Sequence, residues 1–158
     1  TLSLHDALPI SRTAEGMEID EAAALAEDMF ARTETFFSVN TLDYLQKGGL
    51  IGAVGALIGS IFGIRPIVHL KEDGNLEVVD KCRTRKKVLK RMIELAAEKQ
   101  PIEAVYVAHA VAAEDAQALK QEMQELFPGV PAMVTGIGTV LAAHLGPGVI
   151  GLFVRRRA

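Results

Sequence analysis

Residues Thr41 to Ile67 read T-L-D-Y-L-Q-K-G-G-L-I-G-A-V-G-A-L-I-G-S-I-F-G-I-R-P-I. Between Lys47 and Arg65 this stretch contains 17 residues without a charge, and six of them are glycine. A segment this apolar is unfavourable in water, so the fold must bury it or cover it with something apolar. The stretch therefore predicts either a core element or a surface that binds an apolar ligand.

The uncharged run has three physical interpretations. A membrane span needs about 20 apolar residues, so the run is slightly short, although Gly55, Gly59 and Gly63 have the spacing of packed membrane helices. Because Arg65 and Pro66 lead directly into a hairpin pattern, we expect no stable membrane insertion. A buried core helix is the second interpretation, but each interior glycine costs roughly 0.5–1 kcal/mol relative to alanine. The third is close approach by another backbone or by a long apolar ligand.

Helix and strand patterns alternate along the rest of the chain. Helical spacing of apolar residues predicts helices over 20–31, 41–48, part of 48–63, 84–100, 113–127 and 139–145. Short apolar, β-branched or alternating segments predict strands over 35–39, 65–71, 76–82, 105–110, 133–135 and 149–155. The turn signal Asp73-Gly74-Asn75 joins the second and third of these strands as a hairpin. This order predicts an α/β domain with a mixed sheet flanked by helices.

Composition limits the classes of function. The chain has 158 residues, 49% of them apolar and 23% charged, which is enough for one domain with a core. Its net charge of −3 argues against a general nucleic-acid binder. Cys82 is the single cysteine, so no intrachain disulfide is possible and a reducing cytoplasm is the expected compartment. The four histidines lack the spacing of metal ligands, and no metal site is predicted.

The first ten residues read T-L-S-L-H-D-A-L-P-I. They match one reading frame through a common sequencing-adapter oligonucleotide, so we expect residues 1–10 to be a translation artefact rather than a short natural leader. The natural chain would then begin near Ser11, inside a longer reading frame. We expect this segment not to be a secretory signal, because it lacks a basic start and Asp6 interrupts its apolar part.

A basic run follows the predicted hairpin. Lys81 to Arg91 read K-C-R-T-R-K-K-V-L-K-R, with seven positive charges in eleven residues and no acid. Thr84 is well placed as a helix N-cap, which puts the cations of residues 85–87 in the first helical turn. Each cation there opposes the helix dipole by about 0.3–1 kcal/mol. The basic turn is either kept for an anion or is a solvated surface that salt screens.

His144 precedes a Gly146-Pro147-Gly148 turn, whose glycines allow other groups to approach the imidazole closely. The imidazole could donate a hydrogen bond to a carboxylate or phosphate oxygen, or it could be purely structural. No Ser, Cys or Asp lies near it in sequence to complete a nucleophilic triad. We therefore predict no catalytic residue at this position.

Gly136 and Gly138 supply two glycines of a dinucleotide-binding fingerprint. Leu141 stands where the third glycine belongs, and no acidic residue follows to bind a ribose. This motif is incomplete. It supports only an alternative function, in which an α/β enzyme fragment holds a nucleotide phosphate through these glycines and the basic turn at 83–87.

Four motifs in this order resemble the C-terminal domain of the DegV family. They are T-L-D-Y-L-x-K-G-G at 41–49, G-I-R-P-I at 63–67, R-T-R-K-K at 83–87 and H-x-G-P-G at 144–148. The resemblance extends from about Glu15 to the end of the chain. It implies half of a two-domain bacterial fatty-acid-binding protein that presents its fatty acid to a partner kinase, which converts the carboxylate to an acyl phosphate.

The resemblance also implies roles for individual residues. The head group of a long-chain fatty acid would lie near His144, Gly146 and Gly148. The phosphate or the fatty acid kinase would face Arg83, Arg85 and Lys86. The acyl tunnel would be walled by the apolar run, through Ile51, Val54, Leu57, Ile58, Ile61 and Ile64. No cofactor is implied besides the fatty acid ligand.

Two features depart from the family pattern. Leu50 stands where the family usually has arginine after the double glycine, so one cation is missing near the head group. The N-terminal domain, which would supply serine and threonine hydroxyls to the carboxylate, is not in this chain. We therefore expect residues 11–40 to be the end of the interdomain helix and the first strand, and residues 41–158 to be the C-terminal domain. The expected protein is a cytoplasmic fatty-acid carrier and not an enzyme, truncated here to its C-terminal half.

Overall fold

The computed structural model describes residues 16–47 and 63–158, and within them six strands form one mixed sheet. The strand order is β3-β2-β1-β6-β4-β5. The strands are β1 (Thr33–Ser38), β2 (Arg65–Leu70), β3 (Leu76–Cys82), β4 (Ile102–His109), β5 (Ala132–Gly136) and β6 (Ile150–Arg156). Only β4 and β5 pair in parallel, and the other neighbours are antiparallel. The predicted mixed sheet is thus confirmed, including the β2–β3 hairpin.

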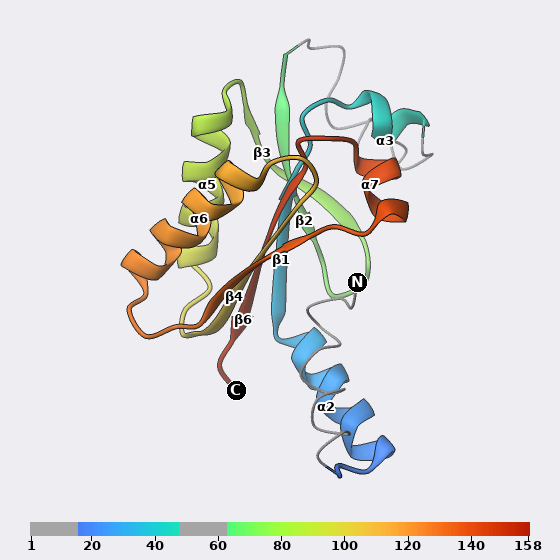
Figure 1. Cartoon of the computed structure of the whole chain (residues 1–158), viewed down its shortest axis with the longest axis vertical. Coiled ribbons are helices and arrows are strands. Elements are labelled where there is room, and N and C mark those ends of the chain that lie inside the picture. Colours follow the sequence, from blue (N-terminus) through green and yellow to red (C-terminus); the bar gives the residue numbers. More distant parts are fainter. Residues whose placement is uncertain (1–15, 48–62) are drawn as a thin grey trace.

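The helices divide between the two faces of the sheet (Figure 1). Two long helices, α5 (Arg85–Ala97) and α6 (Ala113–Leu126), lie side by side on one face. Two short helices, α3 (Asp43–Lys47) and α7 (Thr139–Leu145), contact each other on the other side, near one end of the strands. Helix α2 (Ile19–Ala31) extends from the opposite end of the sheet.

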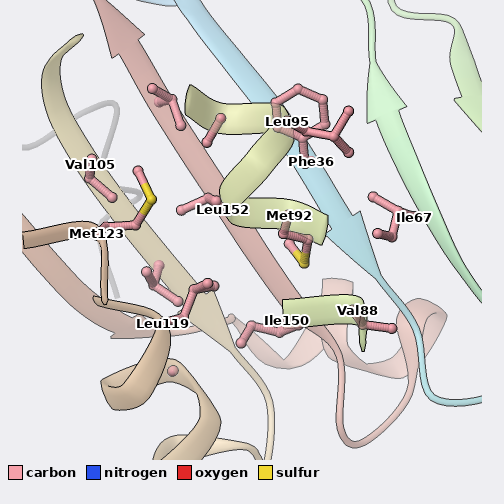
Figure 2. Packing of buried hydrophobic residues seen from close by; sticks show 14 of the residues in the cluster. Phe36, Ile67, Val88, Met92, Leu95, Val105, Leu119, Met123, Ile150 and Leu152 are labelled. Atoms are coloured by element: carbon pink, nitrogen blue, oxygen red, sulfur yellow. The ribbon is translucent and has the colours of Figure 1, made fainter. Parts of the chain in front are cut away.

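The main core fills the space between the sheet and the long helices (Figure 2). Helix α5 contributes Val88 and Met92, and α6 contributes Leu119 and Met123, all at most 1% exposed. Burying each such side chain is worth about 1.5–3 kcal/mol, so this face provides most of the hydrophobic stabilisation. Leu126 follows Met123 by three residues and is nevertheless 50% exposed, because it is the last residue of α6.

A smaller cluster packs α3 and α7 against the other face of the sheet. Leu45 of α3 and Leu145 of α7 are buried with Val39 and Val149, which flank β1 and β6. The strand ends at this position form one row, in which Ile150 pairs with both Ser38 and His109. This cluster fixes the two short helices over one end of the sheet, which we call the α3–α7 end.

The predicted element boundaries are close to the observed ones. Helix α5 ends at Ala97 and not at Gln100, because a residue before proline disfavours helical geometry and Pro101 follows Gln100. Strand β4 begins at Ile102, three residues before its predicted start, since the pairing with β6 continues through an irregularity between Ile102 and Ala104. Within the described part of the chain, no helix is both long and apolar enough to cross a membrane.

Candidate ligand-binding site

The Gly146-Pro147-Gly148 turn is closely packed by side chains from the segment before α3. Both glycines have φ of +83°, a conformation that favours glycine. A Cβ at Gly146 would lie 2.5 Å from the ring of Tyr44, and a Cβ at Gly148 would lie 2.8 Å from the amide of Asn40. The glycines are therefore required for the contact between residues 40–44 and the turn that follows His144.

Hydrogen bonds within the protein already use the amides of this turn. Gly146 N donates to Ala142 O at 2.8 Å, and Gly148 N donates to Ala110 O at 2.7 Å. These two N–H groups are thus engaged inside the fold. The turn shapes the site, and any hydrogen bond to a ligand must come from neighbouring side chains.

Arg65 joins two further segments to this end of the sheet. Its Nε donates to Asn40 Oδ1 at 3.1 Å, and its Nη1 donates to the carbonyl oxygen of Arg83 at 2.9 Å. The first residue of β2 therefore ties the segment before α3 to the basic turn after β3. Arg65 belongs to the G-I-R-P-I motif, which predicts no individual role for it.

Arg85 ties the start of α5 to the glycine turn. Its Nη1 donates to Gly148 O at 2.8 Å, and its Nε donates to Asp115 Oδ2 at 2.7 Å. The Arg85 side chain is 21% exposed, and its Nη2 is buried without a hydrogen-bond partner. Arg85 is consequently a fixed part of the α3–α7 end, with one N–H donor still unsatisfied.

The four motifs that are separate in sequence meet at this end. Tyr44 comes from the first motif, Arg65 from the second, Arg85 from the third, and the glycine turn from the fourth. His144 lies in the last turn of α7, immediately before the glycine turn. Its side chain is exposed, and it makes no hydrogen bond or ion pair with residues 16–47 or 63–158. An imidazole in this state is free to bind a ligand.

Three aromatic side chains lie on the sheet face that carries α3 and α7. Phe37, Tyr106 and Phe153 point to this face, since Phe36, Val107 and Leu152 next to them belong to the main core. Tyr106 pairs with Phe153, while Phe37 lies opposite the small residue Gly151. The three aromatic side chains are half-buried. We call this set the aromatic face.

The remaining predicted site residues differ in their surroundings. Arg83 and Lys86 are exposed, and neither side chain makes an ion pair among the described residues. Ile64 is half-buried just before β2. The other five predicted tunnel residues lie outside the described residues, as does Leu50.

Acidic groups neutralise the later part of the basic run. Arg91 Nε lies 2.8 Å from Asp80 Oδ2, and its Nη1 lies 3.1 Å from Glu94 Oε2. Hydrogen bonds that Arg91 donates to Glu94 and to Asp80 raise the pKa of Arg91. Burial raises the pKa of the nearby Cys82 thiol, which stays protonated near neutral pH. At residues 83–87, Arg85 pairs with Asp115, whereas Arg83, Lys86 and Lys87 make no ion pair with the described residues.

The two glycines of the incomplete nucleotide motif also lie at the α3–α7 end, because Gly136 pairs with His109 and Gly138 caps α7, but they lie toward the edge of the sheet formed by β5. Gly136 ends β5 at one edge of the sheet, whereas residues 83–87 follow β3, the strand at the opposite edge. Gly138 leads into α7, which has 7 residues. Among the described residues, no group of three or more His, Cys, Asp and Glu side chains is arranged to hold a metal ion.

Several residues of this end have no role that the sequence predicts: Asn40, Tyr44, Arg65 and Asp115. Tyr44 and Arg65 stand inside quoted motifs, which was the available signal. No sequence motif indicated Asn40 or Asp115. Asn40 accepts a hydrogen bond from Arg65, and Asp115 accepts one from Arg85, and only the fold brings these pairs together.

Comparisons with known proteins agree with this architecture. The model of the family described as uncharacterised protein, DegV family, matches residues 11–157. A DegV domain-containing protein from Streptomyces coelicolor is 40% identical over 156 residues, covering 96% of this chain and 55% of the relative. The chain spans about half the length of the curated relatives it matches.

Two solved structures extend the comparison. A fatty acid binding DegV family protein from Streptococcus agalactiae has a TM-score of 0.78 at 29% identity, covering 95% of this chain and 54% of that one. A stearic acid-binding protein from Eubacterium ventriosum has a TM-score of 0.80 at 25% identity, covering 97% of this chain and 56% of that one. Sequence and structure agree, and the chain belongs to the DegV family.

Proposed function

We propose that this chain is the C-terminal half of a protein that binds a long-chain fatty acid. One observation carries the proposal: an exposed imidazole and the buried, unsatisfied Nη2 of Arg85 flank one turn at the end of the aromatic face. A fatty acid has the matching form, with an anionic head and an apolar chain. The fatty-acid-binding relatives from Streptococcus agalactiae and Eubacterium ventriosum support the same ligand class.

In this proposal the carboxylate lies at the α3–α7 end. His144 donates a hydrogen bond to it, and Arg85 contributes positive charge from behind the glycine turn. Hydrogen bonds to charged groups are typically worth about 1.5–3 kcal/mol, so these two groups can fix the head group. Gly146 and Gly148 position the turn. The acyl chain then runs along the aromatic face, with Ile64 and the residues of the apolar run as its further walls.

The protein acts as a carrier and has no catalytic role in this proposal. An upstream domain of about equal size supplies the remaining carboxylate ligands, in keeping with the half-length match to relatives. Residues 11–40 then form the end of the interdomain helix and the first strand, residues 41–158 form the C-terminal domain, and the compartment is the cytoplasm. Leu50 leaves the head group with one cation fewer than usual in the family.

The head-group assignment is tested with His144→Ala in the longer protein, recovered by extending the reading frame upstream. Stearic acid is titrated by calorimetry. We expect affinity to fall roughly tenfold through loss of one charge-assisted hydrogen bond, with an unchanged melting temperature. Gln124→Ala, an exposed residue of α6, is the control. If His144→Ala lowers the melting temperature and leaves affinity intact, His144 is structural.

We further propose that Arg83 and Lys86 face a fatty acid kinase. Both are exposed, whereas Arg85 is held by Gly148 and Asp115. Arg83→Glu and Lys86→Glu should each slow acyl phosphate formation by the kinase, by roughly tenfold at low salt, because opposed charge reduces the rate of association. Bound lipid should be unchanged, and Lys120→Glu on α6 is the control. Loss of lipid in either variant would place that residue in the ligand site instead.

A further inference from the structure

Arg155 is a buried cation at the end of the aromatic face opposite the α3–α7 end. Its side chain is 8% exposed, and its Nε and Nη1 are buried without hydrogen-bond partners. The Nη2 atom lies 3.4 Å from Glu103 Oε1, a long contact. Glu103 uses its other oxygen to accept from Arg32 at 2.7 Å. The acids nearby therefore leave two of the Arg155 donor groups unsatisfied.

The direction of Arg155 follows from the strand register. Leu152 and Val154 point into the main core, so Phe153 and Arg155 point to the aromatic face. The guanidinium carbon lies 5.9 Å from the centre of the Tyr106 ring, which belongs to the same face. From Gly148 to Arg155 the chain advances seven residues, or about 23 Å at ~3.3 Å per residue. This span is of the order of an extended long-chain acyl group.

Unsatisfied donors on a buried cation are unfavourable. A buried N–H without a partner retains its full desolvation cost, and the cost is larger on a charged group. The methyl end of an ordinary fatty acid offers no acceptor and would leave Nε and Nη1 unsatisfied. An oxygen at the far end of the chain could accept from both. The Tyr106 ring stabilises the cation from one side only.

We propose that Arg155 recognises an oxygen atom at the end of the acyl chain remote from the carboxylate. The preferred ligands are then long-chain fatty acids with a terminal hydroxyl or other oxygen-bearing group. This inference rests on the proposed function, because it requires the acyl chain to lie along the aromatic face.

The test compares stearic acid with ω-hydroxystearic acid by calorimetry in the longer protein, with the 158-residue chain measured alongside. The hydroxylated acid should bind roughly tenfold more tightly, the effect of one hydrogen bond to a charged group. Arg155→Met keeps an unbranched apolar stem, although a shorter one, removes the donors, and should abolish this preference. Arg157→Met is the matched control, since Arg157 is exposed just beyond β6, and should preserve the preference.

The possible outcomes are distinguishable. If both acids bind the wild-type protein equally, or stearic acid binds more tightly, the role of Arg155 is overturned while fatty-acid binding stands. If neither acid binds, both proposals fail. If Arg155→Met does not fold, Arg155→Lys keeps the charge but lacks the planar guanidinium, and it should reduce the preference. An unchanged preference in that variant also overturns the inference.

Discussion

Gly146 sets the strictest steric requirement in the candidate site. Its φ of 83° and ψ of 167° lie in a region that is essentially restricted to glycine, and the Tyr44 ring fills the space of a Cβ. We expect Gly146→Ala to lower the free energy of unfolding by about 1–3 kcal/mol from backbone strain, with a further cost from displacing Tyr44. Gly136→Ala is the control, because nothing lies within 4 Å of its Cβ position. Equal denaturation midpoints for the two variants would contradict this account of the turn.

Individual residue roles were only partly predictable from the sequence. His144 and Arg85 stand out through their neighbours in the chain, a glycine turn and a cluster of cations. The sequence could not indicate that Arg85 donates to Gly148 O, since the two residues are separated by 63 positions. Nor could it reveal the unsatisfied donors of Arg155, which depend on how the fold buries that side chain.

At the scale of elements, α2 is linked to the sheet through Arg32. This residue donates to Asp28 in the helix, to Glu103 in β4 and to the carbonyl oxygen of Arg156 in β6. The hydrogen bond from Arg32 lowers the pKa of Asp28 below its ordinary value. Since the folded state favours the charged carboxylate, this contribution is present above the ordinary aspartate pKa of about 3.9. It is lost as the pH falls through the lowered pKa.

Hydrogen–deuterium exchange across α2 measures this linkage. Asp28→Asn should speed exchange of residues 19–31 at neutral pH, and the difference from wild type should shrink at acidic pH, as the pH falls through the lowered pKa of the wild-type carboxylate. The effect should be small because Asp28 is exposed. Glu27→Gln, a change in an adjacent exposed residue, is the control and should match wild type. A difference between Asp28→Asn and wild type that grows as the pH falls would contradict the assigned sign.

Most elements were predictable because their periodicity is local. The β2–β3 hairpin follows from its turn residues, and Thr84 accepts from Lys87 N at 3.3 Å as a predicted N-cap should. The start of β4 was not predictable, since residues 102–104 join the sheet only through pairing with β6. The pattern of strands in the sequence also does not predict the order of the strands in the sheet. In the structure β6, the last strand of the chain, lies between β1 and β4.

At the scale of the whole molecule, the fold brings four distant motifs to one end of a sheet and extends an aromatic face away from them. The long helices α5 and α6 pack on the opposite face, and the side chains of the aromatic face are half-buried. This division of the two faces follows from the alternation of side chains along each strand. It is the structural basis for proposing that the same half of the protein contacts the anionic head group of the ligand at the α3–α7 end and the acyl chain along the aromatic face.

The most direct test of this account is mass spectrometry of lipid extracted from the purified longer protein. We expect a long-chain fatty acid at close to one molecule per protein in the wild type, and a reduced amount in His144→Ala. The purified 158-residue chain should retain less, because it would contribute only part of the proposed site. Finding no fatty acid in the longer protein, or finding a nucleotide in its place, would contradict the central claim.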